Sequence, residues 1–171
     1  NQKALGLSGE DLNNAIIKDA YVNQFAGTKM IYLHQSYLGL PVYNQIQVLA
    51  FKEGKVVSQS GGRIRKIESL AGLSATPAFS AENAVVTALK SKNIFNYDKP
   101  EGKKTGSKID FGTLGVCAET ITAELMWLPL QEGKQVRLVW QIRVVPLNSS
   151  DYFMIRVDAM LNKVIDENNF T

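Results

Sequence analysis

The sequence contains very little of what most catalytic sites need. Among its 171 residues there is one histidine, His34, and one cysteine, Cys117. A zinc protease site of the His-Glu-x-x-His type needs two histidines on one helix face, and a serine triad needs a histidine beside its nucleophile. Neither that motif, nor a Gly-x-Ser-x-Gly turn, nor a phosphate-binding glycine loop occurs in the chain. These absences argue against a hydrolase.

Long apolar runs and a strong charge bias are also missing. No apolar run approaches the roughly 20 residues that cross a bilayer, so no transmembrane segment is expected in this sequence. The net charge of +3 is too small to indicate nucleic-acid binding. A single cysteine excludes an intrachain disulfide, but a chain of this length can bury a core without one.

The pattern of residues 1–70 predicts a first unit. Ser8 is a suitable N-cap, and Leu12, Ile16 and Ala20 recur every four residues, which predicts a helix over residues 9–23. Alternating apolar residues predict strands, separated by turns at 38–41 and 52–55, over residues 28–37, 42–51 and 56–61. The first unit is therefore predicted as a helix followed by an antiparallel meander.

Residues 71–171 repeat this order and predict a second unit. Ser80 caps a predicted helix over 80–92, and a polar, glycine-rich excursion over 97–118 forms a loop or a loose hairpin. Period-2 alternation then predicts strands over 121–127 and 136–144, and residues 152–158 and 163–166 are predicted to form a hairpin. The fold class is therefore α+β, with two units that each pack a helix on an antiparallel sheet.

His34 and Cys117 each allow a structural and a functional interpretation. His34 lies in a predicted strand among apolar residues, which favours a packing or surface histidine over a ligand or a base. Free cysteine is among the most buried residue types, so a buried thiol is favoured over a nucleophile at Cys117. Trp127 and Trp140 are expected in the core.

The stretch from Met30 to Gly61 resembles the propeptide motif of fungalysin- and thermolysin-type metalloproteases. It reads as two strands around a glycine turn followed by a Gly-Lys-Val hairpin, with Tyr32, Gln35, Gly39 and Val42 at motif positions. Residues 138–145 and 152–166 resemble the PepSY module of the same propeptides, with Trp140 and Asp158 at its positions. The resemblance implies two cystatin-like or PepSY-like units.

These motif residues also have structural interpretations. Gly39 suits the turn, and Val42 and Trp140 suit the core. Gln35 and Asp158 are expected to satisfy buried backbone groups rather than to contact a protease directly.

The resemblance implies a function for the chain as a whole. It is similar to the N-terminal propeptide of a secreted zinc metalloprotease precursor, with no catalytic activity and no cofactor of its own. Its partner is the downstream catalytic domain in cis, which holds the zinc, and a signal peptide is presumed removed. Asp166 and Glu167 are candidates to enter the catalytic cleft and occupy the open position of the zinc, with a solvated tail as the alternative.

Other functions stay open at this point. The same architecture suits a standalone exported protease inhibitor or an envelope interaction module. A small-molecule carrier would need an open apolar pocket, which a sequence does not show. A hydrolase lacks a base and a metal set.

Overall fold

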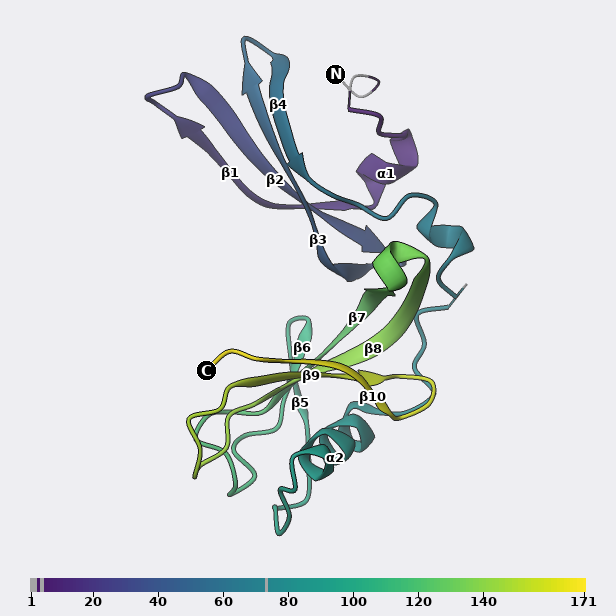
Figure 1. Cartoon of the computed structure of the whole chain (residues 1–171), viewed down its shortest axis with the longest axis vertical. Helices are drawn as coiled ribbons and strands as arrows, with labels where there is room; N and C mark the ends of the chain where they lie inside the picture. Colours follow the sequence, from purple (N-terminus) through teal and green to yellow (C-terminus); the bar gives the residue numbers. More distant parts are fainter. Residues whose placement is uncertain (1–2, 4, 73) are drawn as a thin grey trace. The chain divides into compact units, whose positions relative to one another are not determined.

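The structure is a computed structural model, which describes residues 3, 5–72 and 74–171. The fold is α+β, dominated by antiparallel strands with few helices (Figure 1). The chain divides into two compact units. Unit 1 comprises residues 1–74 and 127–136, and unit 2 comprises residues 75–126 and 137–171. The predicted domains 1–70 and 71–171 remain a prediction about which segments fold on their own.

Unit 1 is built on four antiparallel strands. Its elements are α1 (Gly9–Asn13), β1 (Ala15–Asn23), β2 (Thr28–Tyr37), β3 (Leu40–Lys52), β4 (Lys55–Gly61) and the 3-10 turns η1 (Ile67–Ser69) and η2 (Gln131–Gly133). The strands pair in the order β1-β2-β3-β4. Trp127, from a strand shared with unit 2, pairs in parallel with Val42 of β3.

The predicted helix over residues 9–23 is wrong. Ser8 does cap a helix, through a capping box with Asp11, but this helix ends at Asn13. Residues 15–23 form β1 instead. The pairs Ile16-Ile17 and Tyr21-Val22 are β-branched or aromatic, which favours a strand once β2 offers a partner. Unit 1 is therefore not a long helix packed on a sheet.

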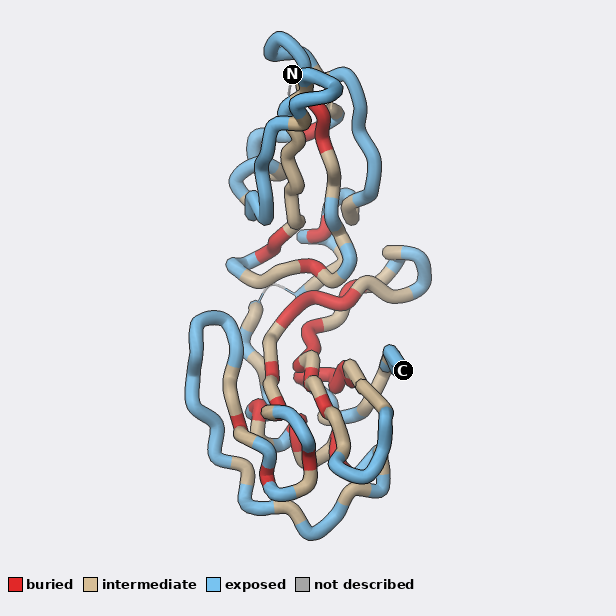
Figure 2. The backbone as a smooth tube through the Cα atoms, turned by 90° about the vertical axis from the view of Figure 1, so that its left-hand side faces the viewer, coloured by how far each residue is buried: buried red, intermediate tan, exposed pale blue. Residues whose placement is uncertain are grey.

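The other predicted strands of unit 1 are confirmed, with β3 starting slightly earlier than predicted. Most of β1 to β4 is exposed or half-buried (Figure 2). The buried apolar side chains of these strands are few: Tyr37, Val42, Leu49 and Ala50. This sheet therefore has little apolar cover of its own.

Unit 2 holds the larger share of the core. Its elements are α2 (Ala81–Ser91), β5 (Lys103–Thr105), β6 (Lys108–Asp110), β7 (Thr122–Leu130), β8 (Gln135–Val144), β9 (Phe153–Asp158) and β10 (Val164–Asn169). The strand order is β5-β6-β7-β8-β9-β10. The excursion over 97–118 contains the β5–β6 hairpin, and β6 adds to the edge of β7.

The predicted helix over 80–92 is confirmed as α2. Ser80 accepts a hydrogen bond from the amide of Asn83, as an N-cap does. The helix buries Ala84, Val85, Ala88 and Leu89 and contacts β9 and β10. Unit 2 thus has the predicted helix on an antiparallel sheet. Among the described residues, none of the helices has the length and apolar character that crossing a membrane requires.

Candidate functional site

The most unusual local structure in unit 1 lies where β3 bulges away from β2. His34 pairs with Ile46, but Ser36 pairs with Pro41, so residues 42–45 of β3 lie opposite Gln35 alone. Asn44, inside this bulge, has a left-handed φ of 55°. A bulge of this kind removes ladder hydrogen bonds, and the freed backbone groups need other partners.

Three consecutive side chains of β2 bind backbone groups around this bulge, and the first of them, His34, binds the bulge itself. The Nε2 atom of His34 lies 2.8 Å from the carbonyl oxygen of Val42. A carbonyl only accepts, so Nε2 carries the hydrogen, and Nδ1 is buried with no hydrogen-bond partner among the described residues. Ser36 binds the carbonyl of Asn14 through both its amide and its hydroxyl, each at 2.6 Å.

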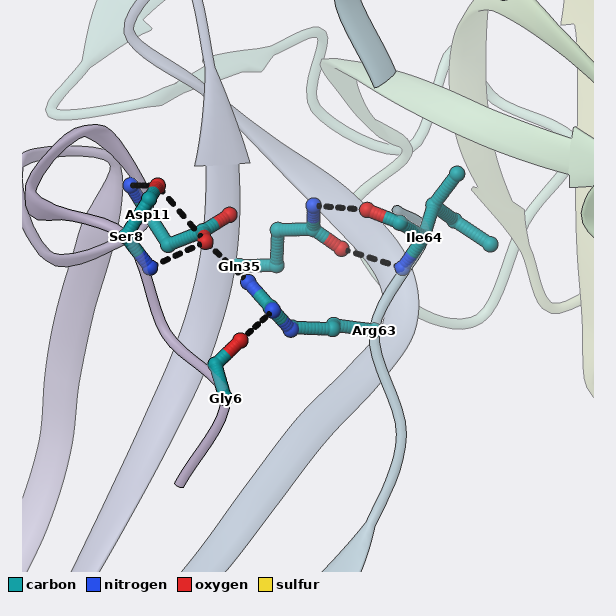
Figure 3. A network of polar contacts seen from close by, with 6 residues as sticks. All are labelled: Gly6, Ser8, Asp11, Gln35, Arg63 and Ile64. Carbon is teal, nitrogen blue, oxygen red and sulfur yellow. Dashed lines mark hydrogen bonds and ion pairs between the residues drawn. The ribbon is translucent and has the colours of Figure 1, made fainter. Parts of the chain in front are cut away.

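Gln35, between them, binds a third segment. Its amide nitrogen donates to the carbonyl of Ile64, and its amide oxygen accepts from the Ile64 amide, both at 2.8 Å. Figure 3 shows this two-bond contact. Residues 34–36 therefore tie β2 to the bulge, to the segment after β4 and to the start of β1.

The turn between β2 and β3 leads into the most buried part of unit 1. Leu38 and Gly39 both have positive φ, 48° and 77°, which fits the two-residue hairpin turn. Val42 has no exposed surface, and Trp127 beside it donates its indole N–H to the carbonyl of Tyr37 at 2.8 Å. The prediction that Trp127 belongs to the core is confirmed.

A cavity of about 360 Å³ lies between the N-terminal segment, β2, β3 and residues 63–68. Arg63 lines this cavity and binds the carboxylate of Asp11 and the carbonyl of Gly6 (Figure 3). Burial by itself raises the pKa of the Asp11 carboxyl. Hydrogen bonds from Arg63 and Ser8 outweigh burial and leave this pKa below its ordinary value.

Tyr32 lies elsewhere on the same sheet. Its ring stacks on that of Tyr21 in β1, with the ring centroids 6.2 Å apart. The four motif positions in unit 1 therefore do not form one site. Gln35, Gly39 and Val42 surround the bulge and its turn, whereas Tyr32 forms a cross-strand aromatic pair.

The motif positions of unit 2 are buried and satisfied. Trp140 donates its indole N–H to the carbonyl of Phe79 at 2.9 Å. Asp158 is 2% exposed and accepts from the amides of Met160 and Leu161 at 2.8 and 3.0 Å. These contacts stabilise the β9–β10 turn, in which Asn162 has a φ of 52°.

Asp166 and Glu167 both lie in β10 and both have partners within unit 2. Asp166 binds the guanidinium of Arg156, which is 1% exposed and also contacts Gln141 and Asn168. Glu167 pairs with Lys92 at 2.6 Å. Entry of this segment into a protease cleft stays a prediction. It requires that each carboxylate keep an oxygen available for the zinc, or give up its present partner, Arg156 or Lys92.

Cys117 shows no sign of an activated thiol. It is 2% exposed, and burial raises the pKa of its thiol. Within the described part of the chain, no group of three or more His, Cys, Asp and Glu residues is placed to hold a metal ion.

Sequence reasoning missed several residues that organise these sites. Arg63, Ser36 and Arg156 act through partners that are distant in the chain, so no local pattern points to them. Of the Arg63 network, only the Ser8 cap could be predicted from the sequence, because Ser8 and Asp11 are three residues apart in the chain.

Comparisons with solved structures found distant likenesses. The C-terminal domain of YpeB from Bacillus megaterium is 10% identical, with a TM-score of 0.44; the match covers all of this chain and 63% of that one. A candidate lipoprotein from Clostridium difficile 630 is 11% identical, with a TM-score of 0.32, over 98% of this chain and 91% of that one. No curated protein gave a significant match.

A comparison with protein families gave one match, and it falls on the bulged sheet of unit 1. The matching residues, 15–62, run from the start of β1 to just beyond β4. They include His34, Gln35 and Ser36 and the β3 bulge, whose Val42 carbonyl His34 binds. Residues 15–62 of this chain carry the Fungalysin/Thermolysin Propeptide Motif.

Proposed function

We propose that this chain is propeptide sequence of a secreted zinc metalloprotease precursor, and that it inhibits the catalytic domain of that precursor and assists its folding. The observation that carries the proposal is the match of residues 15–62 to the fungalysin/thermolysin propeptide motif. The zinc and the catalytic residues belong to the catalytic domain, and the chain is exported or held in the cell envelope. The PepSY-like character of residues 71–171 is part of the same proposal.

The physical basis of both roles is preferential binding to the folded catalytic domain. A chain that binds the native state but not the unfolded state stabilises the native state by mass action. Covalent linkage raises the effective concentration of the propeptide to about millimolar, so modest intrinsic affinity is enough for latency. Cleavage of the linkage removes this advantage and releases activity.

The test is an inhibition assay with separated parts. The catalytic domain encoded by the same precursor gene is produced alone, and peptide hydrolysis is followed as this chain is added. Saturable inhibition that disappears after proteolysis of the added chain supports the proposal. If the chain gives no inhibition and no gain in refolding yield, the proposal is contradicted. Absence of a protease reading frame favours a standalone envelope module.

Entry of Asp166 and Glu167 into the cleft has its own test in this assay. If the two carboxylates reach the zinc, Asp166→Asn and Glu167→Gln raise the concentration needed for half-inhibition about tenfold or more. Glu53→Gln, in the exposed β3–β4 turn, is the matched control and leaves it unchanged. If all three variants inhibit equally, Asp166 and Glu167 do not reach the zinc, and their role is confined to their contacts within unit 2.

A further inference from the structure

The outer edge of β1 is long, apolar and unpaired. β1 pairs with β2 on one side, and no strand in the described part of the chain pairs with its other side (Figure 1). Ile17 and Val22 are each 64% exposed, and Ile16 and Tyr21 are more than two-fifths exposed. An exposed strand edge with such residues is a template for pairing with another strand.

The hydrogen bonds of β1 show which backbone groups face outward. The amide of Ser36 donates to the carbonyl of Asn14, so the Asn14 carbonyl faces β2 at a hydrogen-bonded position of the ladder, while the Asn14 amide donates to the carbonyl of Glu10. Along an antiparallel ladder bonded and non-bonded pairs alternate, so Ala15 and Ile17, opposite Gln35 and Leu33, direct their N–H and C=O groups away from β2.

A bulge changes this alternation in the middle of the strand. Ile17 pairs with Leu33 and Asp19 with Tyr32, so Lys18 is the extra residue. Beyond the bulge the outward residues are therefore Ala20 and Val22. A hydrogen bond supports this assignment: the Ala20 amide donates to the carboxylate of its neighbour Asp19 at 2.8 Å rather than to β2.

This change of alternation fits one symmetric pairing of β1 with itself. A two-fold axis between Lys18 and Asp19 places Lys18 opposite Asp19 of the second copy. The outward-facing residues then oppose one another: Ile17 faces Ala20, and Ala15 faces Val22. Without the bulge, this register would oppose an outward residue with an inward one, and the strands could not bond.

We propose that two copies of this chain associate by antiparallel pairing of β1 with β1 in this register. On one face of the joined sheet, Ile17 then meets Ala20 and Ala15 meets Val22 of the second copy. The two Lys18–Asp19 pairs lie on either side of the two-fold axis. On association Asp19 exchanges the Ala20 amide for Lys18 of the second copy, and that amide joins the new ladder. The arrangement is closed, because each β1 has one outer edge.

The bulge and Lys18 also explain why this edge selects a partner. Edge bulges and lysines usually block indiscriminate strand pairing. Here they disfavour every register that places Lys18 against an apolar or basic residue, and the self-complementary register alone gives both charges a partner.

Charge reversal at these two positions tests the proposal. Lys18→Glu places a glutamate opposite Asp19, and Asp19→Lys places a lysine opposite Lys18, so each variant alone weakens self-association about tenfold or more. Mixing the two variants restores association, because the introduced glutamate of one copy then faces the introduced lysine of the other, and the native charges face each other in the second pair. The full chain is used in sedimentation equilibrium over a concentration series.

Controls and a second variant keep the outcome clear. Lys55→Glu and Glu53→Lys change the same charges at the β3–β4 turn and leave association unchanged. Val22→Pro removes an outward amide and abolishes association, while circular dichroism confirms that each variant is folded. A wild-type chain that is monomeric at every concentration overturns the proposal. Association that ignores both charge reversals, or a mixture that fails to recover, overturns it equally.

Discussion

The side-chain amide of Gln35 pairs with the backbone of Ile64 as one strand pairs with another, through a donated and an accepted hydrogen bond of 2.8 Å each. This contact joins β2 to the chain leaving β4, at the height of the β3 bulge. Because the bulge removes the backbone partners that β3 would supply, a side chain takes over part of the ladder. The geometry suits an amide, since an amide both donates and accepts in one plane.

Gln35→Leu keeps the size of the side chain and removes both bonds. We expect the free energy of unfolding to fall by about 2 to 3 kcal/mol, because the amide and carbonyl of Ile64 lose their partners. Urea unfolding followed by circular dichroism measures the change. Gln47→Leu on β3 is the matched control, since the Gln47 side chain makes no hydrogen bond to another residue in the described part of the chain. Equal losses in the two variants would contradict the assigned role of Gln35.

Asp11→Asn tests the Asp11–Arg63 network through its pH dependence. The folded-state pKa of Asp11 is lowered, so its contribution to stability is complete above the unfolded-state pKa of about 3.9. It is lost as the pH falls through the lower folded-state value. We expect a loss of about 1 kcal/mol at neutral pH, as for other helix caps.

The measurement is urea unfolding of wild type and variant across a pH series. The difference between them should be constant near neutrality and shrink as the pH falls below about 4, where the unfolded wild type takes up a proton at this carboxyl before the folded state does. Glu53→Gln, at an exposed turn, serves as the control. A difference that grows as the pH falls would be incompatible with a lowered pKa at Asp11.

Two glycines with similar backbone angles should respond very differently to alanine. Gly39 and Gly61 have φ of 77° and 81°, but a Cβ on Gly39 meets nothing within 4 Å, whereas one on Gly61 would lie 2.0 Å from the carbonyl oxygen of Ile46. Gly39→Ala should cost about 1 kcal/mol from backbone strain alone. Gly61→Ala should cost at least about 3 kcal/mol, since the β3–β4 pairing must move. Thermal unfolding of both variants measures the contrast, and similar losses would refute the steric argument.

The sequence predicted elements well where local and tertiary preferences agree. The cap at Ser80, the helix over 80–92 and the alternation along β8 were predicted from local pattern, and all are confirmed. The segment after Asn14 shows the opposite case. Leu12, Ile16 and Ala20 have helical spacing, but pairing with β2 favours a strand, and a sequence does not reveal a partner strand in advance.

The candidate site was only partly predictable for a related reason. Gln35 and Asp158 were expected to satisfy backbone groups, and both do. Their partners differ in distance along the chain. Asp158 binds the adjacent turn, but Gln35 binds Ile64, which only the fold brings near. Arg63 and Arg156 were missed because lone arginines carry no pattern, and their function depends on distant carboxylates.

Arg156 leads to the last prediction, because its charge is buried and Asp166 supplies an opposite one. Asp166→Asn keeps the shape but takes this negative charge away from the guanidinium, so we expect a loss of about 2 kcal/mol. Arg156→Met removes the charge and keeps the apolar stem. The double variant should lose about 1 kcal/mol or more less stability than the sum of the two single losses, because both single changes remove the same interaction.

A double-mutant cycle by urea unfolding measures this coupling, with Glu167→Gln as the neighbouring control. The Lys92–Glu167 pair is more exposed, with 45% of the Glu167 side chain accessible, so that change should cost less than about 1 kcal/mol. Strictly additive losses at Arg156 and Asp166 would show that they are independent. Strong coupling would mean that Asp166 cannot leave Arg156 without destabilising unit 2. Glu167 would then be the better candidate of the two to reach a protease cleft.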